Sequence, residues 1–185
     1  MALKNITKNV FADELVKMVS EMPFDKIRVG ELCRRCEADR RTFYYHFMDK
    51  YDLVSWIFTK DYVQSLEAEN GIFTLQHSIN ILERMYEKKD FYKAAFSDTS
   101  QNAIRHYTYG YFVKQGSEAM KKHFHTETLS MERDYAVRAH AHACVELSFE
   151  WLKGELNYTP EQFARLQYRF MPADLKAAYG ITGEY

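Results

Sequence analysis

The side chains best suited to recognising another molecule gather in one short run of the chain, between Arg40 and Phe47. Phe43 and Phe47 are four residues apart, so on a helix they share one face and can anchor that helix to a core. Arginine can pair bidentately with guanine, and the hydroxyls of threonine and tyrosine can bond phosphates. The residues around the two phenylalanines are therefore candidates for a DNA-binding face: Arg40, Arg41, Thr42, Tyr44, Tyr45 and His46.

The alternative for the adjacent Tyr44 and Tyr45 is burial in the core. A helix face that is merely solvated more often carries Glu, Lys and Gln than two neighbouring tyrosines. Because Phe43 and Phe47 already supply the inward anchor, we expect the tyrosine pair to be exposed.

The residues before this run predict the elements that would hold it in place. A helix is expected over residues 29–35, followed by a turn at Glu37-Ala38-Asp39, where Asp39 is a good N-cap for the next helix. Two short helices joined by a three-residue turn outline a helix-turn-helix. An earlier helix, from Ile6 to Met22, carries an apolar stripe that includes Ile6 and Val10 and ends at Pro23.

The rest of the chain also predicts helices joined by short loops. Asp49 caps a helix over residues 50–67, and Asn70-Gly71 is the clearest break after it. Further helices are expected over residues 74–88, 90–96, 101–124, 129–153 and 159–170. The chain has only 7 Gly and 3 Pro, which disfavours a strand-rich fold with frequent turns. We therefore expect an all-α protein.

Positive charge is concentrated locally, because the formal net charge of the whole chain is only −1. That balance is not typical of a generic polyanion binder. Between residues 34 and 50 five basic residues face three acidic ones, a local net charge of +2: Arg34, Arg35, Arg40, Arg41 and Lys50 against Glu37, Asp39 and Asp49. Any DNA-binding surface should lie in this segment.

Other chemistry-bearing residues give weaker signals. Cys33 and Cys36 form a C-x-x-C, but zinc would need a second ligand pair that the sequence lacks, so we expect both in the core. His140 and Cys144 can share a helix face, which we expect to pack at a dimer or pocket wall. No catalytic motif stands out, and we expect no metal and no cofactor.

The composition also bears on compartment and on ligands. The start of the chain lacks an apolar signal region, and no apolar run approaches the ~18 residues of a membrane span. With an odd number of cysteines, this favours a cytoplasmic protein without a membrane partner. Ten C-terminal aromatics are expected mostly in the core, with some lining a cavity for a small apolar effector: Tyr86, Phe91, Tyr92, Phe96, Tyr107, Tyr109, Tyr111, Phe112, Phe149 and Trp151.

The stretch from Val29 to Leu53 resembles the signature of TetR-family regulators, above all in the run Thr-Phe-Tyr-Tyr-His-Phe at residues 42–47, followed by Asp49-Lys50. The resemblance implies phosphate contacts from Thr42 and Tyr44, groove contacts from Tyr45 and His46, a backbone clamp at Lys50, and base readout by Arg40 and Arg41. The sequence departs from the family at Glu37, where a turn glycine is usual, and at Arg28, where a Ser or Thr cap is usual.

A narrower resemblance links the chain to regulators of dihydroxyacetone-kinase operons. It is carried by Phe24-Asp-Lys-Ile, Arg40-Arg-Thr-Phe-Tyr, Asp49-Lys-Tyr-Asp-Leu and Asp90-Phe-Tyr-Lys-Ala. That group includes activators that work with a kinase-like partner, so the resemblance leaves repression and activation open.

Together these features predict a helix-turn-helix DNA-binding domain at residues 1–50 and a helical dimerisation and effector domain at residues 51–185. The resemblance implies a homodimer built from the helices over 129–153 and 159–170, a pseudo-palindromic double-stranded DNA operator, and a small-molecule effector or kinase-like co-regulator. The alternatives are a helical protein-interaction adaptor without DNA binding and a small helical enzyme.

Overall fold

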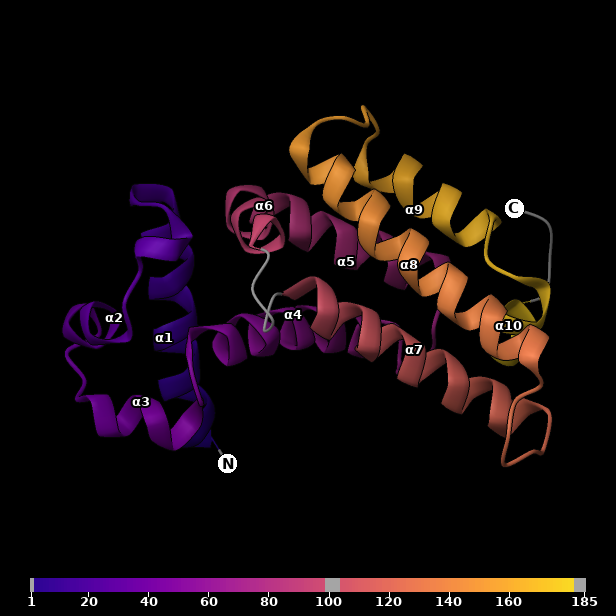
Figure 1. Ribbon diagram of the computed structural model, residues 1–185, viewed down its shortest axis with the longest axis horizontal. Helices are drawn as coiled ribbons and strands as arrows, with labels where there is room; N and C mark the ends of the chain where they lie inside the picture. The colour runs from indigo at the N-terminus through magenta and orange to yellow at the C-terminus, as the bar shows by residue number, and fades with distance from the viewer. Residues whose placement is uncertain (1, 99–103, 182–185) are drawn as a thin grey trace.

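The computed structural model describes residues 2–98 and 104–181, and within these ranges the chain forms ten α-helices, one short 3-10 turn and no strand (Figure 1). The elements are α1 Ala2–Glu21, η1 Phe24–Lys26, α2 Val29–Arg35, α3 Arg40–His46, α4 Lys50–Glu67, α5 Leu75–Glu87, α6 Lys89–Ser97, α7 Ile104–His123, α8 Met131–Lys153, α9 Pro160–Arg169 and α10 Ala173–Ala178. The expected all-α fold class is confirmed.

Local capping sets several of the helix starts where the sequence predicts them. The side chains of Asp39, Asp49, Thr74 and Thr159 each accept a backbone N–H of the helix that follows. The helix expected from residue 129 begins instead at Met131, because Ser130 caps it. The expected start of α7 at residues 101–103 lies outside the described residues.

The apolar stripe expected on α1 is wrong at its N-terminal end. Ile6 and Val10 are exposed, whereas Phe11, Leu15 and Met18 face the core. Leu15 and Met18 belong to the stripe that the sequence favours, so the stripe is correct beyond Val10, and tertiary packing decides which apolar residues of a broad stripe are covered.

Helix α4 joins the two parts of the molecule. In Figure 1, α1, α2 and α3 gather at one end, α4 runs from them into the larger bundle, and α8 and α9 lie side by side on that bundle. Helix α4 packs against α1 on one side and against α5 and α7 on the other, while α6 also reaches α1. A single core cluster runs from Phe11 through Phe58 to Trp151. No helix in the described parts of the chain is both long and apolar enough to cross a membrane.

Candidate nucleic-acid interface

The turn between α2 and α3 keeps the geometry that a glycine would give, although Glu37 stands there. Glu37 has a φ of +50°, in the left-handed region that non-glycine residues seldom adopt. Its N–H donates to the Arg34 carbonyl (3.3 Å) and the Ala38 N–H donates to the Cys33 carbonyl (3.0 Å). These two bonds are those of a Schellman C-cap, so α2 ends normally despite the substitution.

Helix α3 begins at a charged cap. The Asp39 carboxylate accepts the Thr42 N–H at 2.6 Å. This bond is the main reason that the pKa of the Asp39 carboxyl lies below its usual value. The first turn of α3, which follows this cap, carries the exposed Arg40 and Arg41.

Two phenylalanines anchor α3, as the sequence predicts. Phe43 and Phe47 are both buried. The Phe43 ring meets Phe11 of α1 edge-on, with 5.2 Å between centroids, and the Phe47 ring meets Trp56 of α4 at 5.9 Å. The Lys8 ammonium lies over both the Phe47 and Trp56 rings. Contacts with α1 and α4 therefore hold the helix rigidly from two sides.

The opposite face of α3 is open to solvent. Tyr44 is 51% exposed and Tyr45 is 70% exposed, so neither belongs to the core. Arg40 and Arg41 are exposed as well, whereas Thr42 and His46 are half-buried at the edges of this face. Six of the seven expected site residues thus lie on one short helix. Met48, 80% exposed just beyond it, is a surface residue that the sequence reasoning passed over.

Lys50 is placed differently from the other candidates. Its ammonium donates to the carbonyls of Phe24 (2.7 Å) and Ile27 (3.3 Å) and lies 4.4 Å from the centroid of the Phe24 ring. Burial is the main cause that lowers the pKa of this side chain. Two of its three N–H donors therefore tie the start of α4 to the η1 turn.

Not all of the local positive charge is available to a partner. The Arg35 guanidinium bonds Glu21 (2.6 Å) and Glu14 (3.3 Å) of α1, and Arg34 pairs with Glu31 within α2. Among the described residues no ion pair involves Arg40 or Arg41. The cationic charge at this end is therefore most accessible at the start of α3.

The cysteines near the turn have structural positions. Cys33 is buried, and Cys36 lies against the Val10 carbonyl with a sulfur–oxygen distance of 3.8 Å. Burial raises the pKa of the Cys36 thiol to about 11, which keeps it protonated at neutral pH. Across residues 2–98 and 104–181, no three His, Cys, Asp or Glu side chains come together as a metal site would require.

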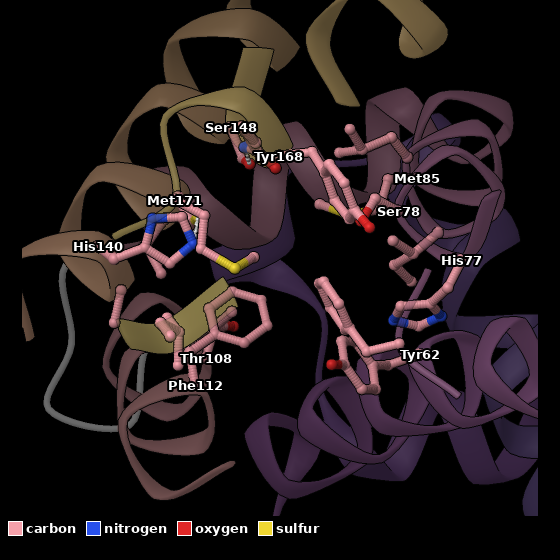
Figure 2. Close-up of a pocket in the computed structure, with 18 of the residues that line it drawn as sticks. Tyr62, His77, Ser78, Met85, Thr108, Phe112, His140, Ser148, Tyr168 and Met171 are labelled. Carbon is pink, nitrogen blue, oxygen red and sulfur yellow. Dashed lines mark hydrogen bonds between the residues drawn. The ribbon is translucent and has the colours of Figure 1, made fainter. Parts of the chain in front are cut away.

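A pocket lies within the C-terminal bundle, away from α3 (Figure 2). Its volume is about 90 Å³, and α4, α5, α7, α8 and α9 all contribute to its walls. Of the ten aromatics that were expected mostly in the core and in part at a cavity, Phe96 and Phe112 line the pocket. Tyr62 and His77 also line the pocket and are absent from the residues that the sequence predicted there, although a histidine on the apolar side of α5 was a usable signal.

The outward side of α8 carries exposed apolar residues among the polar Arg138, His142 and Glu146. Met131, Tyr135 and Leu147 are exposed, and their positions differ by four residues or a multiple of four. Alanines occupy the two intervening positions of this series, residues 139 and 143. Phe170, which caps the end of α9, is also exposed. Small residues at such steps allow a second helix to approach closely.

Comparison with known proteins adds a family and a fold. Residues 74–172 match the TetR-type family described as the transcriptional regulator C-terminal region. The chain is 25% identical over 92 residues to the HTH-type dhaKLM operon transcriptional activator DhaS of Lactococcus lactis subsp. lactis (strain IL1403). That match spans 49% of this chain and 49% of the relative, about half the length of each. The solved structure of the dihydroxyacetone kinase operon activator DhaS has a similar fold, with a TM-score of 0.64 at 17% identity over 93% of this chain and 97% of that one.

Proposed function

Because this chain belongs to the TetR-type family of transcriptional regulators, we propose that it controls transcription by binding double-stranded DNA as a homodimer. The observation that carries the proposal is the exposed face of α3, which presents Arg40, Arg41, Tyr44 and Tyr45 to solvent from a helix anchored by buried Phe43 and Phe47. A short helix held in this way can enter a major groove. The proposal places the protein in the cytoplasm, with its DNA, and gives it no catalytic activity.

Each residue of the face has a proposed role. Arg40 and Arg41 read base edges, because their guanidinium groups are exposed and can pair bidentately. The Thr42 and Tyr44 hydroxyls bond phosphates, and Tyr45 and His46 lie against the groove. Lys50 contacts the DNA backbone only through its third N–H donor, because backbone carbonyls of the protein accept the other two.

The homodimer is supported by exposed apolar residues of α8. Exposed Tyr135 and Leu147, with Phe170 at the end of α9, form a surface that two copies can cover by packing α8 and α9 as four helices. A two-fold interface uses the same patch on both subunits, so it presents two α3 helices to a pseudo-palindromic operator.

Helix α4 offers a physical link between the pocket and α3. Its first turn is tied to η1 by Lys50, and further along the same helix Phe58 and Tyr62 form part of the pocket wall. An effector or a kinase-like co-regulator that favours one position of α4 would change the separation of the two α3 helices. The relative is named as an activator, and a reporter fused to the upstream DNA would show the sign of regulation for this chain.

The test is a gel-shift titration on DNA upstream of the gene, repeated at several salt concentrations. We expect affinity to fall steeply with salt, and Arg41→Ala, which removes a proposed base contact, to cost about 1–3 kcal/mol of affinity and to relax the sequence preference. Lys93→Ala, at an exposed position of α6, removes the same charge far from α3 and should leave affinity and sequence preference unchanged. Binding that ignores salt and both substitutions would favour the helical adaptor instead.

A further inference from the structure

The C-terminal end of α3 has little positive charge of its own. Asp49 and Asp52 stand at the start of α4, just beyond this end, and their carboxylates outnumber the single ammonium of Lys50 there. That ammonium is turned toward the carbonyls of Phe24 and Ile27. The carbonyls at a helix C-terminus also carry partial negative charge. A phosphate beside this end of α3 would therefore need a cation from elsewhere in the fold.

The length of α3 brings both of its ends close to DNA phosphates. The helix has 7 residues, which at about 1.5 Å each extend about 10 Å. The major groove is about 12 Å wide, so a helix of this length lying across the groove reaches from one phosphate backbone toward the other. Arg40 and Arg41 lie at the start of the helix. The C-terminal end is then left to meet the second backbone.

Helix α1 brings a lysine to this end. The Lys8 ammonium lies 5.3 Å from the centroid of the Phe47 ring and 5.5 Å from the centroid of the Trp56 ring. Phe47 is the C-cap of α3 and Trp56 belongs to α4, so the ammonium sits where these two helices meet. Figure 1 shows the N-terminal end of α1 beside α3. The missing cation is therefore supplied by a residue about 40 positions earlier in the chain than the end of α3.

The ring contacts hold the Lys8 ammonium without using its hydrogen bonds. A cation over an aromatic face is attracted by the negative face of the ring and keeps both its charge and its N–H donors. Among the described residues no carboxylate forms an ion pair with Lys8, whereas Glu14 and Glu21 pair with Arg35. The side chain is only half-buried, so an anion can reach it. Lys8 thus keeps the donors that Lys50 has given to carbonyls.

We propose that Lys8 binds a DNA phosphate beside the C-terminal end of α3 and supplies most of the backbone contact that the family resemblance implies for Lys50. The proposal rests on the proposed function, because it names a further residue of the same DNA-binding surface. A phosphate contact adds affinity and orientation without reading the base sequence. The Phe47 and Trp56 rings hold the ammonium in place before DNA arrives, so less side-chain entropy is lost on binding.

The test combines Lys8→Gln with DNA in which one phosphate at a time is replaced by an uncharged methylphosphonate. The duplex carries the operator, located by footprinting wild type on the upstream DNA, and gel shifts on the full-length protein give the affinity at several salt concentrations. We expect Lys8→Gln to reduce the slope of log affinity against log salt by about one per half-site. One methylphosphonate in each half-site should weaken wild type roughly tenfold, the value of one charge-assisted hydrogen bond, and leave Lys8→Gln unaffected. Other sensitive phosphates should affect both proteins alike.

Matched variants separate a phosphate contact from a structural role. Lys8→Arg keeps the charge and the ring contacts and should keep the wild-type slope. Lys17→Gln removes an exposed charge further along α1 and should also leave the slope unchanged. Urea unfolding shows whether Lys8→Gln stays folded, and Lys8→Met, which keeps an apolar chain on the two rings, replaces it if it does not.

The proposal is overturned if Lys8→Gln keeps the wild-type slope, or if every phosphate that matters to wild type matters equally to Lys8→Gln. A purely structural role would give the second result together with a loss of stability in urea. If wild type binds no DNA, the proposed function fails as well. If wild type binds DNA and depends on Arg41, but Lys8→Gln behaves like wild type, only the role of Lys8 is wrong.

Discussion

The Lys88 ammonium contacts both carboxylate oxygens of Asp61, at 2.6 and 2.8 Å, and joins the middle of α4 to the junction of α5 and α6. Asp61 is only 1% exposed, and the Tyr92 hydroxyl also donates to it at 2.6 Å. Burial, followed by the charge of Asp61, raises the pKa of Tyr92. The cluster fixes the position of α4, the helix that connects the pocket to α3.

Asp61→Ala should therefore destabilise the protein strongly. It leaves the buried Tyr92 hydroxyl and the Lys88 ammonium without their acceptor, and losing one partner of a buried pair costs about 3 kcal/mol or more. Urea unfolding followed by circular dichroism measures the change. Asp13→Ala, at an exposed position of α1, is the matched control and should change stability by less than about 0.5 kcal/mol. Equal effects of the two substitutions would contradict the structural role of the cluster.

Glu37→Gly should stabilise the protein by about 1 kcal/mol, because glycine relieves the cost of the left-handed backbone at this turn. Glu118→Gly, within α7, should have the opposite effect and cost about 1 kcal/mol. Thermal unfolding compares the two. A loss of stability in Glu37→Gly would mean that the Glu37 side chain contributes more than its backbone strain costs.

Lys50→Met should lower stability by about 1–2 kcal/mol, since the carbonyls of Phe24 and Ile27 lose their donor. We expect it to change the slope of log affinity against log salt by well under one, because two of the three Lys50 donors are already engaged. Unfolding and gel-shift titrations on the same sample separate the two roles. If stability is unchanged and the slope of log affinity against log salt falls by a full unit, Lys50 contacts the DNA backbone instead.

Stability should decline in acid because of His140. Its pKa is lowered to about 4 in the fold from an ordinary 6.5, so between these values the unfolded chain binds a proton that the folded protein does not. The free energy of unfolding therefore falls as the pH drops from 6.5 to 4, and burial of His77 acts in the same direction. His140→Gln should reduce this loss by roughly 2–3 kcal/mol, whereas His106→Gln, at a solvent-exposed position, should not. If the free energy of unfolding depended on pH in the same way in wild type and His140→Gln, His140 would not be the cause of the loss of stability in acid.

Ala143→Arg should separate the proposed dimer, because a long charged side chain at the small-residue step of α8 prevents close helix approach. Sedimentation equilibrium should give a monomer, and operator affinity should fall at least tenfold because one half-site is lost. Lys114→Arg, on an exposed part of α7, is the control and should remain dimeric. A dimeric Ala143→Arg variant would place the interface elsewhere.

Local features of this protein follow from its sequence alone. The caps at Asp39, Asp49 and Thr159 set helix starts because a cap needs only the backbone of the next three residues. The four-residue spacing of Phe43 and Phe47 predicted which side of α3 is anchored, and the tyrosines between them are exposed as expected. The exposed face of α3 could be predicted because its periodicity lies within one short helix.

Only the tertiary structure decided which polar groups are engaged. Arg35 counted as free positive charge in the sequence, but it is paired with Glu14 and Glu21, which α1 brings alongside it. Lys50 meets the carbonyl of Phe24, 26 residues earlier in the chain. His77 becomes a fully buried imidazole, with its ring against Tyr62, only where α4 packs on α5. Such pairings depend on contacts between distant helices, and periodicity within one helix carries no information about them.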